Sequence, residues 1–154
     1  MKKVLFLLTV TICAVNVFAQ DGAKPNVIKA NPLGLLFGSA NVSYERAFGE
    51  KSAIQINGAF GGLSVGGVKY TNIGGGVDYK YYVSNSKTAP EGFYVSPGVG
   101  FYSLKVKEAG GTSVSGSGAI VKAVVGNQWI WDSGFSLDLF GGINYYAGGR
   151  IKGT

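Results

Sequence analysis

Polar and apolar residues alternate along most of this chain with the period of two that is typical of β-strands. The clearest case is the segment 71–83, where mostly apolar residues and tyrosines hold the odd positions and mostly polar residues and glycines hold the even ones. The alternation outlasts a typical globular strand. A tilted strand that crosses a lipid bilayer needs about 9–11 residues, so the pattern predicts a strand of membrane-spanning length.

Six further segments repeat this design and are separated by turn-forming residues. We expect strands over residues 26–37, 40–48, 52–61, 93–106, 119–131 and 135–146. The connections are expected at residues 38–39, 49–51, 61–68, 84–92, 107–118, 132–134 and from 148 onward. Direct connections make each strand antiparallel to the next. The sequence therefore predicts one all-β domain with an antiparallel, up-and-down sheet of seven strands.

Residues 26–37 break the alternation. In a regular strand, Lys29 and Asn31 would share a face with Leu33. Proline is tolerated at bulges and edges, so we expect a bulge at Pro32 that moves Lys29 and Asn31 to the polar face. Whether this first strand turns Lys29 toward the polar or the apolar side stays open.

The aromatic residues of the apolar faces distinguish two architectures. A soluble barrel of lipocalin type points its apolar face inward, whereas an outer-membrane barrel points it at lipid. The aromatic residues gather near both ends of the strands, with aliphatic residues and glycines between them. One predicted girdle comprises Phe48, Tyr79, Tyr81, Phe93, Trp129, Trp131 and Phe135, and the other comprises Phe37, Phe60, Phe101 and Tyr145. Because aromatic girdles mark both membrane interfaces, the sequence favours a transmembrane β-barrel, with a soluble periplasmic lipid-binding barrel as the alternative.

An odd number of strands does not fit a closed bacterial barrel, because single-chain barrels have an even number. An open edge in lipid also leaves backbone groups without hydrogen-bond partners. We therefore expect an eight-stranded type of barrel whose last strand would follow residue 150 and pair with residues 26–37. On this interpretation residues 20–154 form a barrel domain that is truncated at its C-terminus.

The N-terminal residues 1–19 have the order of a secretory signal peptide: two lysines, a short apolar run and a cleavage pattern that ends at Ala19. The mature chain is expected to begin near Gln20, without Cys13, and its net charge falls from +6 to +4 when both lysines are removed. Lipoprotein processing at Cys13 is disfavoured, because the bulky Ile12 precedes it. The remaining charges are scattered singly along the sequence, so nucleic-acid binding has no support.

Two motifs carry a resemblance to a known family. The first is Asn26-x-x-Lys29-x-Asn31-x-Leu33, and the second is Tyr44-Glu45-Arg46 followed by a short turn. Together they resemble a family of small Gram-negative outer-membrane β-barrels of unknown function. The Gly-rich strands are similar in architecture to the transmembrane domain of outer-membrane protein A. The resemblance implies a protein of the cell outer membrane with a periplasmic N-terminus, whose partners are outer-membrane lipid and the barrel assembly machinery. It implies no catalytic residues, and the missing last strand departs from it.

Few charged residues fall on the polar faces, which would line the lumen of a barrel. They are Glu45, Asp78, Lys80, Lys122, Asp138 and, if the first strand has its bulge, Lys29. Four of them lie near the connections at residues 49–51, 84–92 and 132–134, which fall at the same end of the sheet. These four, Glu45, Asp78, Lys80 and Asp138, are therefore expected at the same height in the lumen. Since buried charges must be paired, we expect an ion-pair plug in a lumen that side chains fill. The alternative is a gate or an ion path through a narrow lumen.

Catalytic chemistry has little support in the sequence. The chain contains no histidine, which excludes Ser–His and Asp–His machinery. No spacing of Cys, Asp or Glu suggests a zinc or calcium site, and no cofactor is expected. We therefore predict a non-enzymatic protein with a structural or surface-interaction role through residues 61–68, 107–118 and 148 onward, for which the sequence identifies no ligand. A narrow channel for ions or small solutes is the alternative.

Overall fold

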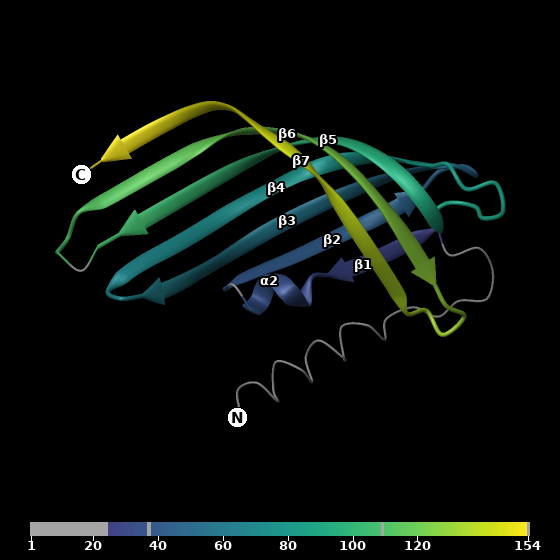
Figure 1. Cartoon of the computed structure of the whole chain (residues 1–154), viewed down its shortest axis with the longest axis horizontal. Helices are drawn as coiled ribbons and strands as arrows, with labels where there is room; N and C mark the ends of the chain where they lie inside the picture. Colours follow the sequence, from purple (N-terminus) through teal and green to yellow (C-terminus); the bar gives the residue numbers. More distant parts are fainter. Residues whose placement is uncertain (1–24, 37, 109, 154) are drawn as a thin grey trace.

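The computed structural model describes residues 25–36, 38–108 and 110–153, and nearly all of them belong to one antiparallel sheet. In chain order the elements are β1 (Asn26–Ala30), α2 (Pro32–Leu36), β2 (Ser39–Ala47), β3 (Ser52–Val65), β4 (Val68–Tyr82), β5 (Gly92–Lys107), β6 (Ser113–Ile130) and β7 (Ser136–Gly153). The strands lie side by side in sequence order (Figure 1). This confirms the predicted all-β, up-and-down antiparallel topology. The predicted signal peptide, residues 1–19, lies outside the described residues.

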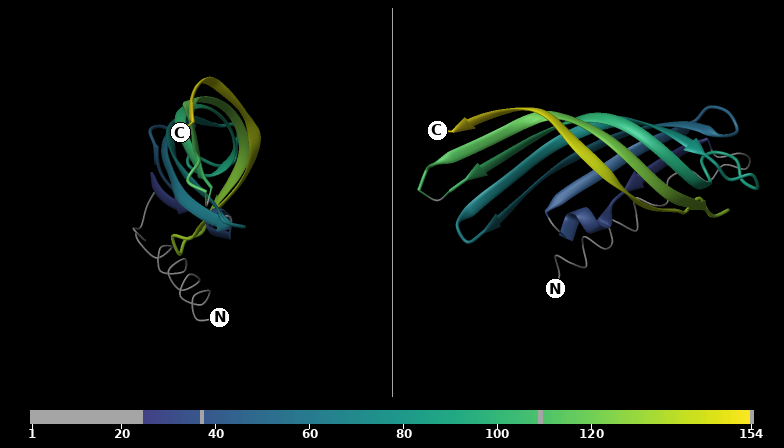
Figure 2. Two further views of the ribbon diagram at one scale, coloured as in Figure 1. Left: turned by 90° about the vertical axis from the view of Figure 1, so that its left-hand side faces the viewer. Right: turned by 45° about the horizontal axis from the view of Figure 1, so that its top comes forward.

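The sheet is strongly curled. Seen end-on, its strands curve around a common axis (Figure 2). β1 and β7 are the two edges, and no backbone pairing joins them in the described part of the chain. Their side chains nevertheless meet, because Lys29 Nζ of β1 lies 2.6 Å from Asp138 Oδ2 of β7. The concave face is therefore bridged by side chains where the backbone ladder is open.

The two faces of the sheet differ in polarity over most of its length. The largest fully buried side chains all lie on the concave face: Tyr82, Tyr94, Lys80, Gln128 and Glu45. On the convex face Ile56, Val99 and Val125 are 56%, 59% and 50% exposed. Alternation along paired strands produces this division. Its result is a polar interior and an apolar exterior.

The predicted first strand, residues 26–37, is wrong beyond Ala30. Residues 32–36 form the short helix α2, which packs against β2. The Gly34 N–H donates to Asn31 Oδ1 at 3.3 Å, so Asn31 caps the helix and Pro32 occupies its first position, where a proline is well tolerated. No bulge is needed to orient Lys29, because the strand ends before the alternation is broken. Lys29 pairs with Ser43 in the ladder and shares the concave face with Glu45.

Three predicted loops are mostly strand. β3 and β4 extend through residues 61–68 to a two-residue turn at Gly66 and Gly67, whose φ values of 59° and 81° suit a hairpin turn that requires positive φ at both residues. β5 and β6 likewise pair through most of residues 107–118, and β7 continues past residue 148. The predicted surface loops at 61–68, 107–118 and 148 onward are therefore corrected to long paired hairpins and an extended edge strand. Continuous backbone pairing outweighs the weak strand propensity of the Gly/Ser-rich segments.

Candidate functional site: a buried polar cluster behind an apolar belt

Four charged side chains from four strands meet on the concave face. Lys29 Nζ lies 2.5 Å from Glu45 Oε2 and 2.6 Å from Asp138 Oδ2. Lys80 Nζ lies 3.2 Å and 3.0 Å from the same two oxygens. Two ammonium groups therefore face two carboxylates. We call Lys29, Glu45, Lys80 and Asp138 the charge cluster; it is neutral as a whole.

Neutral side chains complete the hydrogen bonding of the charge cluster. The Tyr82 hydroxyl donates to Glu45 Oε1 at 2.5 Å, and the Tyr94 hydroxyl donates to Asp138 Oδ1 at 2.8 Å. Gln128 Oε1 accepts from both cluster lysines, at 2.5 Å and 3.3 Å. The ammonium of Lys80 also lies 3.8 Å from the centroid of the Tyr94 ring, a distance suited to a cation–π contact. Each carboxylate oxygen of the cluster therefore has a donor.

The sequence had not singled out Tyr82, Tyr94 or Gln128 as partners of the charges. The only indication that these side chains face inward was the alternation along the strand, because each lies an even number of residues from another inward-facing position. Which charges they contact depends on the register and curl of the sheet. That information is not local to any strand.

Asp78 and Lys122 form a second, separate ion pair, with Asp78 Oδ1 2.8 Å from Lys122 Nζ. Asn57 Nδ2 donates to the other oxygen of Asp78 at 2.7 Å. The sequence placed Asp78 at one level with Glu45, Lys80 and Asp138, whereas the structure pairs it with Lys122. Gly98 makes room for this pair, since a Cβ there would fall on the Asp78 carboxylate.

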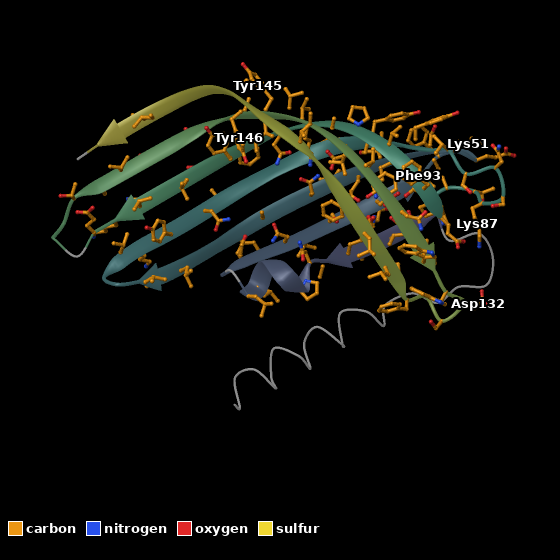
Figure 3. All side chains as sticks on the ribbon, in the orientation of Figure 1. Lys51, Lys87, Phe93, Asp132, Tyr145 and Tyr146 are labelled. Atoms are coloured by element: carbon orange, nitrogen blue, oxygen red, sulfur yellow. The ribbon has the colours of Figure 1, made fainter. Side chains whose placement is uncertain are left out.

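The aromatic residues expected in the two girdles lie exposed on the convex face, apart from Phe37, which lies outside the described residues. Neighbouring rings are in contact: Phe48 and Tyr79 have centroids 6.2 Å apart, and Trp131 and Phe135 have centroids 5.1 Å apart. In Figure 3, Phe93 lies at the end of the sheet that carries Lys51, Lys87 and Asp132, whereas Tyr145 lies near the middle of the sheet. The exposed members are Phe48, Tyr79, Tyr81, Phe93, Trp129, Trp131, Phe135, Phe60, Phe101 and Tyr145.

The polarity of the two faces reverses beyond Phe60 and Phe101. We call the end of the sheet beyond these residues, with the β3–β4 and β5–β6 turns, the distal end. On its concave side one ladder row joins Leu63, Tyr70, Val106 and Val114. On its convex side the neighbouring row joins Thr71, Lys105, Ser115 and Lys152. The apolar surface of the convex face is thus a belt with a defined limit.

Comparison with protein-family models, curated proteins and solved structures finds no match for this chain. The family resemblance of its Asn-x-x-Lys and Tyr-Glu-Arg motifs therefore stays a prediction. Within the described residues no helix is both long and apolar enough to span a membrane. The same part of the chain contains no group of three or more Cys, Asp or Glu side chains arranged to hold a metal ion.

Proposed function

We propose that this chain is a non-enzymatic, integral outer-membrane β-barrel protein with a filled lumen and a structural or surface-interaction role. The observation that carries the proposal is the apolar belt, whose large side chains are exposed on the convex face between two bands of aromatic residues. A soluble monomer rarely exposes a contiguous apolar patch beyond a few hundred Å². Lipid would cover such a belt, and aromatic bands are enriched at both membrane interfaces.

The reversal of polarity at the distal end supports the same proposal. Inside a bilayer the outer face of a barrel must be apolar, whereas in water the outer face of a sheet is polar. The convex face changes from Phe101 to Lys105 within one strand. A membrane boundary at this level accounts for the change, which a uniform aqueous environment does not.

The charge cluster favours a filled lumen over a channel. Its two lysines and two carboxylates neutralise each other, and bulky Tyr82, Tyr94 and Gln128 surround them without exposure to solvent. An ion path needs sites that an ion can enter and leave. A soluble lipid-binding barrel is a weaker alternative, because its ligand would meet this charged interior rather than an apolar one.

The proposal places two requirements on the molecule. The backbone groups at the edges of β1 and β7 must be hydrogen-bonded within the bilayer, because lipid offers no partners. The surface-interaction role falls to the distal hairpins rather than to loops, since residues 61–68 and most of 107–118 are paired strand.

A pair of arginine substitutions tests membrane insertion. Val125→Arg places a charge within the belt, at a side chain that is 50% exposed, and Thr112→Arg places one in the exposed connection between β5 and β6 at the distal end. In a bilayer the first is expected to cost about 2–4 kcal/mol and to reduce the alkali-resistant, heat-modifiable form on a gel. Thr112→Arg is the matched control and is expected to insert normally, because its charge lies outside the belt and outside the paired strands. Equal behaviour of both variants, with the protein in the soluble fraction, would contradict the proposal.

A further inference from the structure

Four exposed lysines gather on the convex face of the distal end. Lys69 of β4 and Lys107 of β5 are directly paired in the ladder. Lys105 and Lys152 share the next convex row, each opposite Ser115 of the intervening strand β6. All four side chains are exposed. We call them the distal lysine band.

The band is not neutralised within the described part of the protein. The ion pairs found there use Lys29, Lys80, Lys87 and Lys122, and none uses a lysine of the band. Paired strands are about 4.8 Å apart, and like charges directly opposite each other destabilise a sheet. The direct pairing of Lys69 with Lys107 therefore has a cost that an external anion would offset.

The height of the band relative to the belt suggests where this anion lies. Lys105 follows Phe101 by four residues on the same face, which is about 13 Å along a strand. For a strand tilted by about 40°, this is roughly 10 Å along the membrane normal. The headgroup regions add about 5–8 Å to each side of the hydrocarbon core. Lysine side chains are long enough to reach back into that layer.

We propose that the distal lysine band binds the anionic phosphates of lipid headgroups in the leaflet at this end of the barrel. A hydroxyl group accompanies the charges, because Ser115 pairs with both Lys105 and Lys152 in the ladder. The inference rests on the proposed membrane insertion, which gives the band its place beside the headgroups.

The opposite end of the sheet lacks such a band. There Lys87 is paired with Glu91, at 2.8 Å, and Lys51 donates to Asn85 at 3.0 Å. The connections at this end also carry Glu50 and Asp132, so positive and negative charges are mixed. The distal connections carry the single acidic residue Glu108 beside these lysines, so positive charge predominates there and the attraction for anionic lipid is expected to be stronger at the distal end.

Lipid retention by the purified chain tests the proposal. The full chain, purified from membranes in a neutral detergent, is mixed with micelles that contain either phosphatidylglycerol or phosphatidylcholine, and the lipid retained after gel filtration is measured. One variant combines Lys69→Gln, Lys105→Gln, Lys107→Gln and Lys152→Gln. The control variant combines Lys51→Gln and Lys87→Gln. Heat-modifiable gel mobility establishes that each variant is folded.

The expected result is retention of phosphatidylglycerol that falls about tenfold or more in the distal variant and less than about twofold in the control. Salt should weaken the retention by the unchanged chain, because exposed charges are screened. Equal retention by folded distal and control variants would overturn the lipid site. Displacement of the lipid by equimolar inorganic phosphate would also overturn it, because the site would then take free phosphate.

The result of the lipid-retention test can be distinguished from the result of the membrane-insertion test. A chain that inserts into membranes but retains phosphatidylglycerol equally in every variant refutes the lipid site alone. A chain that fails the Val125→Arg and Thr112→Arg insertion test refutes the proposed function, and with it the placement of the distal lysine band.

Discussion

At the scale of single residues, the charge cluster depends on an exact balance of charge. Asp138 contacts both Lys29 and Lys80 through one oxygen, and it accepts from the Tyr94 hydroxyl through the other. Its side chain is 11% exposed and that of Lys80 is 2% exposed. Solvent therefore has little access to compensate for a lost partner. Breaking a buried pair by removing one partner is costly for this reason.

We expect Asp138→Asn to lower the free energy of unfolding by about 3–5 kcal/mol. The substitution leaves the two cluster lysines opposite a single carboxylate, Glu45. Urea unfolding of the protein in lipid vesicles, followed by the fluorescence of Trp129 and Trp131, measures the change. Lys87→Gln is a suitable control, because it breaks an exposed pair that is expected to contribute less than about 1 kcal/mol.

A double substitution tests the balance itself. Lys80→Gln combined with Asp138→Asn leaves one lysine opposite one carboxylate, Lys29 and Glu45, at 2.5 Å. The combined cost is expected to be smaller than the sum of the two single costs by about 1–3 kcal/mol. Strictly additive costs would show that the two side chains act independently, contrary to the geometry.

At the scale of elements, the curl of the sheet requires close approach of β4 and β5. Gly76 and Gly100 are directly paired on the concave face. A Cβ at Gly76 would lie 2.5 Å from the Val99 carbonyl oxygen and 3.1 Å from the Gly100 Cα. Glycine is needed here for proximity rather than for a special φ value. The concave glycines thus allow strands with large convex side chains to curve tightly.

Gly76→Ala is therefore expected to destabilise the protein by about 1–3 kcal/mol through overpacking. Gly58→Ala is the matched control in the neighbouring strand β3, because a Cβ there has nothing within 4 Å. An alanine at that position is expected to be neutral or slightly stabilising, since glycine is costly within a strand. Thermal unfolding of both variants compares the two effects. Similar losses in both would mean that the β4–β5 approach is not limiting.

The helix α2 shows how a local signal can outweigh a periodic one. The spacing of Leu33 and Leu35 fits a strand, but Asn31 and Pro32 fit a helix N-cap and first helical position. The capping signal prevails because Pro32 has no N–H to donate to a strand ladder. Both signals are present in the sequence, but the capping signal is local and the alternation depends on a regular strand.

At the scale of the whole molecule, the filled interior predicts the absence of conduction. In planar bilayers we expect the unchanged chain and Asp138→Ala to show near-zero single-channel conductance, because Tyr82, Tyr94 and Gln128 still fill the interior of the variant. A rise in conductance for Asp138→Ala would contradict the filled lumen and would favour the gate alternative. Liposome swelling with small sugars gives an independent measure of the same property.

Alternation by itself determined the antiparallel strands, their order and the face on which most of the interior charges lie, but it left the face of Lys29 open. These features follow from a period of two and from short connections, which are local properties of the chain. Glu45, Lys80 and Asp138 could therefore be assigned to one face without coordinates. The aromatic residues of the two bands could be assigned to the opposite face for the same reason.

The tertiary structure decided which of these residues meet. The curl of the sheet brings β1 to β7, so that Lys29 contacts Asp138, and the register separates Asp78 into its own pair with Lys122. The register shift between Gly118 and Ala119 places Lys152 opposite Ser115 and so on the convex face. Lys105 and Lys107 are neighbours along β5, whereas Lys69 and Lys152 join them only through the pairing of strands. Contacts between distant strands depend on register and curvature, and neither is encoded in the period of any one strand.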